Sequence, residues 1–532
     1  MNKNNFIFSE SGFLNSNIFF YIIPVLYFIV MLIITLSNRL IGDYGVETDF
    51  YVAYVTQAKE FLKGNLIIDQ FRGPVYQIFL AATGFFFKYD FYLAGKFLNV
   101  LCASISLFFI SKLINSIFNR EGALITVLFV SVNQVFWRYT YEPGTDMLFL
   151  VFYTSSVFFL LKEDNLNYKN LLFAGIFTGL AYLTRYTGIS LILFALLIIF
   201  SKFHNKNITE NISKRSILLK PLVYYLIPVI IFVSGWGLIC YKITGHFIYN
   251  ENYKNTAFTF YKPDTMSKDE WVSKNQDSFK SMSDVVFNDF GTFTKKLGKN
   301  FITYFTKDAF RFFPKYIGIL LGIGLILFIL KWKSENISAK YFLLGSFIFY
   351  LQILLIFYSE RFSIPLLPFY CFLIVNVFSL EFFEKFNLKL SNFKLFGLIL
   401  FSLILLNFYN SYLIAKEDIN KVPVEILTVR DFVEKNYKEE FYRKSIMARK
   451  PHIAYYLNMQ FIAMPYSENY SEFIQNVKYN NADYVFVSEN EGLISSTENL
   501  KKNLLFAESP PEELEVVTST TNPVTILYKV KK

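Results

Sequence analysis

The chain has 532 residues, of which 54% are hydrophobic, 20% are aromatic and only 18% are charged. About a quarter of the residues in an average soluble domain are charged, so this composition excludes an ordinary soluble globular protein. The formal net charge of +10 does not indicate a nucleic-acid partner, because the lysines fall in short loops between apolar segments.

Apolar segments long enough to cross a membrane recur along the chain. A hydrocarbon core of about 30 Å requires roughly 17–25 apolar residues in a helix, and on this basis we predict about eleven spanning helices. Their expected ranges are 18–37, 91–114, 121–138, 145–162, 169–185, 187–203, 219–241, 313–331, 340–358, 362–380 and 395–414. The segment 74–87, "PVYQIFLAATGFFF", is too short to span easily, so we expect it to lie in the membrane interface or to re-enter.

Basic residues accumulate in alternate connections between these helices, which predicts the orientation of the chain. The basic connections lie around residues 112–120, 162–169, 202–220, 331–340 and 385–394. By the positive-inside rule these connections are expected in the cytoplasm. The first loop (38–90), the long loop (242–312) and everything after residue 415 are then expected outside the cytoplasmic membrane.

Residues 415–532 differ in character from the membrane domain predicted over residues 1–414. Segments 443–451 and 482–490 have the composition of short buried strands, segments 422–437 and 467–481 are helical, and 514–530 indicates a closing hairpin. We therefore predict a small extracytoplasmic α/β domain, which we expect to help with the acceptor rather than with the chemistry. No internal repeat is visible, which disfavours transporter folds built from two related halves.

Three short turns that we expect on the outer face each carry one arginine and no lysine. These are Arg138 in "VFWRYTYEPGTD", Arg185 in "YLTRYTGI" and Arg361 in "YSERFSIP". The guanidinium group is a planar fork that binds phosphate through two parallel hydrogen bonds. A single interfacial arginine is commonly an anchor for its helix, but three in turns flanked by Tyr or Phe indicate a phosphate group held at the outer leaflet.

Carboxylates fall on the same predicted face. Asp49 begins an amphipathic stretch suited to the interface, Asp146 begins the fourth predicted span, and Glu47 and Glu142 accompany them. Helix capping is the simplest explanation for each acid alone. It does not explain why the acids gather beside the arginines, where a carboxylate near a phosphate is costly. We interpret the group as an active site in which an acid removes a proton from an attacking hydroxyl.

Five motifs in chain order resemble a known superfamily. They are "TDFYVAYVTQAKEFLKG", "RGPVYQIFLA", "EPGTDMLFLVF", "GLAYLTRYTGISLIL" and "ERFSIPLLPFYCFL". Most of residues 20–380 resembles the GT-C membrane glycosyltransferases, family-39 type, which includes protein O-mannosyltransferases and the lipid A aminoarabinose transferase. The resemblance implies a polyprenyl-phosphate sugar as the membrane-lipid donor and an acceptor glycan, lipid or protein. We expect transfer by a single displacement, which inverts the anomeric carbon. It also implies that Asp49 is the catalytic base and that Asp146 is the second acid of the site.

The same resemblance implies that Arg185 and Arg361 hold the donor phosphate, and we expect Arg138 or Arg72 to support them. Many members have a His or Glu before the proline of the "RGPVY" segment, whereas this chain has Arg72 and Gly73. Only three histidines are present, so we predict no metal site and no cofactor beyond the donor, and a divalent metal requirement is doubtful.

A polytopic transporter or lipid flippase is the alternative function. Transporters place their polar residues near the bilayer midplane, often in helices broken by Gly or Pro. Here the acids and arginines gather at one predicted face, which favours the glycosyltransferase. The identity of the sugar and of the acceptor stays open.

Overall fold

The computed structural model describes residues 17–531, apart from residues 164, 211–213, 267, 276–277, 380–387, 391–392, 438–439, 442, 492–497 and 508. The chain forms two compact units. The first, which we call the helical unit, comprises Met1–Ser37, Glu60–Phe260 and Lys280–Ile419. The second, the sheet unit, comprises Asn38–Lys59, Tyr261–Phe279 and Asn420–Lys532. Part of the first predicted loop therefore clusters with the C-terminal residues.

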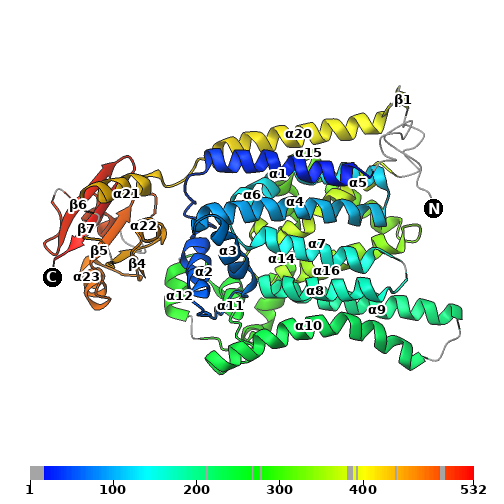
Figure 1. The fold of residues 1–532 in the computed structure, drawn as a ribbon, viewed down its shortest axis with the longest axis horizontal. Coiled ribbons are helices and arrows are strands. Elements are labelled where there is room, and N and C mark those ends of the chain that lie inside the picture. Colours follow the sequence, from blue (N-terminus) through cyan, green and yellow to red (C-terminus); the bar gives the residue numbers. More distant parts are fainter. Residues whose placement is uncertain are drawn as a thin grey trace. The chain divides into compact units, whose positions relative to one another are not determined.

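The helical unit is a bundle in which long helices such as α4, α7, α8 and α10 lie side by side (Figure 1). Its helices are α1 (Phe19–Asn38), α3 (Val75–Phe86), α4 (Phe91–Ile117), α5 (Arg120–Ser131), α6 (Gln134–Tyr141), α7 (Thr145–Leu161), α8 (Tyr168–Thr184), η3 (Tyr186–Gly188), α9 (Ile189–Glu210), α10 (Lys214–Thr244), α11 (Tyr253–Tyr261), α13 (Met282–Asn288), α14 (Phe290–Phe312), α15 (Lys315–Leu330), α16 (Ile337–Ile353), α17 (Glu360–Ser363), η4 (Ile364–Leu366), α18 (Leu367–Val377) and α20 (Leu395–Asp418). A two-stranded ribbon, β1 (Lys389–Leu390) with β2 (Phe393–Lys394), precedes α20.

Several of these helices can cross a membrane, which confirms the predicted multi-pass helical membrane protein. Within the described ranges, six segments have the length and apolar composition of a span: α1, α4, α20, Tyr186–Phe203, Leu219–Thr244 and Glu360–Val377. A seventh is added if α6 and α7 count as one bent span. All eleven predicted ranges coincide with helices in whole or in part, but the number of crossings remains a prediction.

One predicted helix, over residues 121–138, is not continuous. Helix α5 ends at Ser131, and α6 begins at Gln134 after a break. The Asn133 side-chain oxygen accepts hydrogen bonds from the backbone N–H groups of Val135 and Phe136, so this residue caps a new helix inside the apolar run. The next connection turns sharply, with α6 and α7 at 118° to each other.

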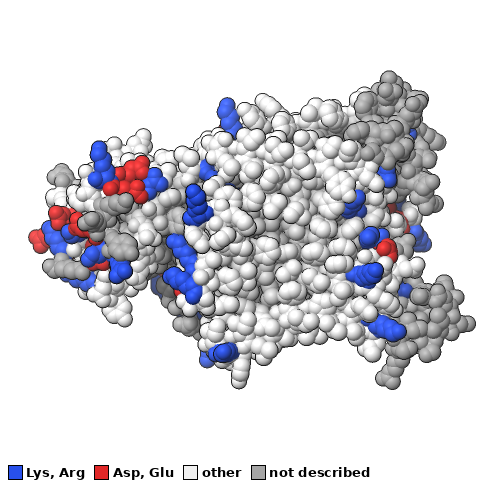
Figure 2. All heavy atoms as spheres, in the orientation of Figure 1, with Lys and Arg blue, Asp and Glu red and all other residues white. Residues whose placement is uncertain are grey.

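The surface of the helical unit matches a lipid environment. Figure 2 shows a broad face of this unit with almost no charged side chains, and lysines and arginines lie nearer its ends. A contiguous apolar surface of this kind is unfavourable in water. Such a surface is stable against the lipid of a bilayer, because helices satisfy their own backbone hydrogen bonds.

The sheet unit contains a five-stranded sheet in the order β4-β3-β5-β7-β6. Strand β3 pairs in parallel with β4 and β5, whereas β7 pairs antiparallel with β5 and β6. The bounds of its elements are η2 (Phe50–Tyr54), α2 (Val55–Leu62, which ends in the helical unit), α12 (Lys268–Asn275), α21 (Val424–Asn436), β3 (Ser445–Ala448), α22 (His452–Tyr456), β4 (Gln460–Ala463), α23 (Tyr470–Tyr479), β5 (Tyr484–Ser488), α24 (Glu498–Leu505), β6 (Leu514–Thr521) and β7 (Val524–Val530). The predicted strands, helices and closing hairpin are all present.

The central strands β3 and β5 are buried on both faces. In β5, Val485 and Val487 enter one hydrophobic cluster with residues of α23 and α24, while Tyr484 and Phe486 enter another with residues of α21 and α22. Successive strand residues point to opposite faces, so a doubly covered strand is apolar at every position. The second cluster also contains Ile41, so the first loop contributes to the core of the sheet unit.

Candidate active site

The centre of the candidate site in the helical unit is a buried carboxylate between two guanidinium groups. Asp146, in the first turn of α7, forms an ion pair with Arg185, the residue that ends α8. Arg361 of α17 places its Nε 3.5 Å from Asp146 Oδ2. The Asp146 side chain is only 2% exposed, and those of Arg185 and Arg361 are 14% and 13% exposed. Three segments that are distant in sequence therefore meet at one acid.

The turn that delivers Asp146 is fixed by a side chain from another helix. Asn99 of α4 donates through its amide nitrogen to the carbonyl oxygens of Tyr139 (3.0 Å) and Glu142 (2.6 Å). Its Oδ1 accepts from the backbone N–H of Gly144 at 3.5 Å. Asn99 is buried, so these bonds form where water does not compete, and they define the sharp reversal between α6 and α7.

A second group of charges extends the first. Arg138 Nε lies 2.8 Å from Glu142 Oε1, and Arg138 Nη1 lies 3.6 Å from Glu360 Oε1. Glu360 is adjacent in sequence to Arg361, so the two groups share α17. The structure thus brings together five of the predicted residues, namely Asp146, Arg185, Arg361, Arg138 and Glu142, and it adds Glu360.

Contacts to an aromatic ring and to carboxylates hold the arginines of this cluster in a position to bind an anion. The Phe362 ring centre lies 5.1 Å from the Arg185 guanidinium carbon and 5.5 Å from that of Arg361, a distance at which a ring attracts a cation. The cluster contains three arginines and three carboxylates, so its charge is balanced. Each guanidinium has five N–H donors, more than one carboxylate can use, so the arginines can bind a further anion while the acids keep them in position.

Asp308 of α14 supports the segment that carries Arg361. Its carboxylate accepts hydrogen bonds from the hydroxyl groups of Tyr358 (2.9 Å) and Tyr370 (2.8 Å). Asp308 is fully buried, and this burial raises the pKa of its carboxyl group to about 7. Because Tyr358 lies three residues before Arg361, Asp308 fixes the start of α17.

The "RGPVY" segment packs against the end of α8. The Arg72 side chain pairs with Asp69 at 2.9 Å, and its carbonyl oxygen accepts from the Tyr186 hydroxyl at 3.2 Å. A Cβ atom on Gly73 would lie 1.9 Å from the carbonyl oxygen of Leu183, two residues before Arg185. This close approach of two backbones explains why a side chain such as His or Glu is absent from position 73.

The other two predicted acids, Glu47 and Asp49, belong to the sheet unit. Glu47 is fully buried, pairs with Arg39 and accepts from the backbone N–H of Asp43 at 2.7 Å. Asp49 stands at the N-terminal cap position of η2, but its side chain makes no capping hydrogen bond there. Capping therefore does not account for Asp49.

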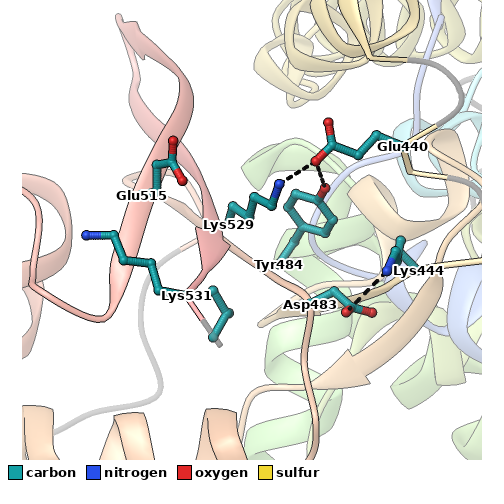
Figure 3. A pocket seen from close by; sticks show the side chains of 8 residues that line it. Glu440, Lys444, Asp483, Tyr484, Glu515, Lys529 and Lys531 are labelled. Carbon is teal, nitrogen blue, oxygen red and sulfur yellow. Dashed lines mark hydrogen bonds and ion pairs between the residues drawn. The ribbon is translucent and has the colours of Figure 1, made fainter.

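A pocket of about 320 Å³ also lies in the sheet unit, and Figure 3 shows its lining. Four of its charged residues form ion pairs, since Lys529 Nζ lies 2.5 Å from Glu440 Oε1 and Lys444 Nζ lies 3.7 Å from Asp483 Oδ1. None of the predicted site residues lines this pocket. We assign it no part in the chemistry.

Comparisons with known proteins bear on the fold of the chain. A family model described as dolichyl-phosphate-mannose-protein mannosyltransferase matches residues 73–236, whereas no curated protein matches the chain. ArnT from Cupriavidus metallidurans bound to undecaprenyl phosphate has a similar fold, with a TM-score of 0.54 at 10% identity over 96% of this chain and 98% of that one. The Archaeoglobus fulgidus oligosaccharyltransferase in complex with Zn and sulfate gives a TM-score of 0.54 at 12% identity, over 96% of this chain and 73% of that one. The chain thus has the fold of these solved structures, and its residues 73–236 match a glycosyltransferase family model.

The GT-C resemblance predicted from the five motifs is thus confirmed, together with the fold. The roles of individual residues remain proposals. In the part of the chain that the structure describes, no group of three or more His, Cys, Asp or Glu residues could hold a metal ion.

Replacing Gly73 by Ala should destabilise the protein, because the added methyl group meets the Leu183 carbonyl. Overpacking of this kind typically costs about 1–3 kcal/mol. Thermal unfolding in detergent measures the loss, with Gly298→Ala as the matched control, since a Cβ at Gly298 has no neighbour within 4 Å. Equal unfolding temperatures for the two variants would contradict the close approach.

Asp308 should make the stability of the protein depend on pH. Its folded-state pKa is raised from 3.8 to about 7, so the folded chain holds a proton that the unfolded chain has lost, and stability falls as pH rises through this window. Asp308→Asn should flatten the change in unfolding temperature between about pH 4 and pH 7. Asp289→Asn is the control, because the exposed Asp289 caps the same helix and its pKa is lowered by hydrogen bonds to Thr292. If the unfolding temperature of Asp308→Asn changes with pH as steeply as that of the wild type, Asp308 is not the source of the pH dependence.

Proposed function

We propose that this chain transfers a sugar from a polyprenyl-phosphate donor to an acceptor hydroxyl at the outer face of the cytoplasmic membrane, with inversion at the anomeric carbon. The observation that carries the proposal is the buried Asp146 carboxylate with Arg185 and Arg361 bound to it. Two guanidinium groups at the ends of apolar helices suit the phosphate of a membrane lipid, which combines one anionic group with a long hydrocarbon chain.

The arginines would act on the leaving group. As the bond between the anomeric carbon and the phosphate oxygen breaks, negative charge grows on that oxygen. Arg185 and Arg361 would stabilise this charge with N–H donors that are already in position, which is worth more in a partly buried site than in water. Asp146 would keep the two guanidinium groups in place, and Arg138, held by Glu142 and Glu360, would add positive charge nearby.

Asp49 would act on the acceptor. Its carboxylate would take the proton of the acceptor hydroxyl while the hydroxyl oxygen forms the new bond to the anomeric carbon. The donor carries its own leaving group, so the reaction requires no nucleotide. The proton leaves on Asp49, and the electron pair of the broken bond leaves on the lipid phosphate, which balances the displacement.

One structural relative supports the class of donor, and a second concerns only the acceptor. ArnT of the compared structure binds undecaprenyl phosphate. Another structure of the Archaeoglobus oligosaccharyltransferase holds a tethered acceptor peptide, with a TM-score of 0.50 at 12% identity. We extend only the lipid-phosphate donor to this chain, because the acceptor could equally be a glycan, a lipid or a protein.

The predicted orientation supports transfer on the outer face. The basic connections between the helices are expected in the cytoplasm, which places the ends that carry Arg138, Arg185 and Arg361 on the other side. A polyprenyl-phosphate sugar is an energy source that needs no nucleotide outside the cell, which is consistent with this orientation.

Asp49→Asn should reduce kcat by about 10²–10⁴-fold, the usual contribution of a general base, while donor binding is retained. Transfer from a polyprenyl-phosphate sugar by the purified protein measures this, and parallel assays with EDTA report whether a divalent ion is required. The matched control is Asp90→Asn, since Asp90 caps α4 through Leu93 and Asn fills the same role. Activity above about a tenth of wild type would exclude Asp49 as the base.

Arg185→Lys and Arg361→Lys should each weaken binding of undecaprenyl phosphate by at least about tenfold, because lysine keeps the charge and loses the planar fork. A titration of the purified variants with the lipid gives the dissociation constants. Arg430→Lys serves as control, since Arg430 pairs with the exposed Asp431 in α21. Unchanged affinity in both site variants would place the phosphate elsewhere.

A further inference from the structure

The loop that carries Asp49 is part of the sheet unit. Residues Asn38–Lys59 cluster with Asn420–Lys532, although some 400 positions separate them in the sequence. Ile41 is fully buried in the same hydrophobic cluster as Ile426 and Val429 of α21. The loop is therefore anchored in a folded core at its start.

Internal bonds close the loop on itself. The buried Arg39 and Glu47 form an ion pair, and Asp43 donates its backbone N–H to Glu47 Oε2 at 2.7 Å. The backbone N–H of Gly42 donates to the Tyr51 hydroxyl at 2.9 Å. Because Asp49 lies between Glu47 and Tyr51, both flanks of the proposed base are held by buried contacts.

His452, at the start of α22, holds the middle of the loop. Its Nε2 lies 2.8 Å from the carbonyl oxygen of Asp43, and its ring centre lies 4.9 Å from that of Tyr44 and 4.5 Å from that of Tyr51. Full burial lowers the pKa of His452 to about 3, so the ring is neutral at physiological pH. A carbonyl oxygen only accepts hydrogen bonds, so the single ring proton is on Nε2.

Further bonds from the sheet unit reach both sides of the loop. Lys450 Nζ donates to the Thr48 hydroxyl at 3.3 Å, directly beside Asp49. The Tyr44 hydroxyl donates to Glu425 Oε1 at 3.2 Å, and Thr48 in turn donates to the Tyr44 carbonyl oxygen at 2.8 Å. The segment "ARKPHIAYY" after β3 thus supplies two of the contacts that fix residues 43–48.

We infer that His452 and Lys450 are positioning residues for Asp49, and that the sheet unit takes part in catalysis by orienting the loop that carries the base. The inference rests on the proposed role of Asp49. It differs from the expectation that the C-terminal residues serve only the acceptor. A base that removes a proton must be held within hydrogen-bonding reach of the acceptor, and a displacement of about 1 Å can cost about a hundredfold in rate.

The test compares His452→Phe with His452→Gln in the full-length protein. Phe keeps an aromatic ring against Tyr44 and Tyr51 but removes the donor, whereas the Gln amide can place a donor near the Nε2 position. We expect His452→Phe to lower kcat about tenfold or more with the dissociation constant for undecaprenyl phosphate unchanged, and His452→Gln to restore most of the loss. Hydrogen exchange should be faster than in wild type for residues 42–51 in His452→Phe, and close to wild type in His452→Gln.

Lys450→Met provides a second variant in case His452→Phe does not fold. Met keeps the aliphatic stem of Lys450, whose side chain is partly buried. Lys478→Met, at an exposed site on α23, is its control. Unchanged exchange in residues 42–51 for the His452→Phe and Lys450→Met variants that fold would overturn the inference. Faster exchange with unchanged kcat would also overturn it, since the contacts would then be structural only. If the wild type transfers no sugar from any polyprenyl-phosphate donor, the proposed function fails, and the exchange data alone decide whether His452 and Lys450 fix the loop.

Discussion

The ion pairs around Asp146 are the constraint on which the site of the helical unit depends. A buried carboxylate is strongly destabilising unless cations and hydrogen bonds compensate it, and loss of one partner leaves an uncompensated charge. Asp146 obtains this compensation from Arg185 at the end of α8 and from Arg361 on α17. Apolar packing between helices in lipid is weakly directional. The charges therefore specify which helix ends meet, and Asn99 and Asp308 fix the turns that bring them there.

The gathering of the arginines could be predicted from the sequence, because each is a solitary cation in a short turn between apolar segments. The acids were harder to assign, since an Asp at a helix start is equally well explained by capping. Only the structure distinguishes the two explanations for Asp146, whose carboxylate binds guanidinium groups. Asn99 and Asp308 could not be predicted, because their partners lie 40 or more residues away and neither residue belongs to a local pattern.

The fold could also be predicted only in part: the helices and strands could be, but a break within a helix and a contact distant in sequence could not. An apolar run predicts a helix in lipid but conceals a break, so the interruption at Asn133 was missed although Asn is a common helix cap. In the sheet unit, β3 and β5 are short apolar runs and were predictable as strands. The membership of Ile41 in their core was not predictable, because nothing local in a loop after a membrane helix indicates a partner some 400 residues later.

The proposed reaction assigns its two halves to different units of the chain. Side chains of the helical unit would stabilise the departing lipid phosphate, and a loop held by the sheet unit would activate the acceptor. In this proposal, donor recognition would depend on charges that are locked by ion pairs, whereas acceptor activation would depend on a loop whose supports are in a separate core. This separation gives a physical reason why one fold can serve several acceptors, since the chemistry of the leaving group does not depend on which hydroxyl attacks.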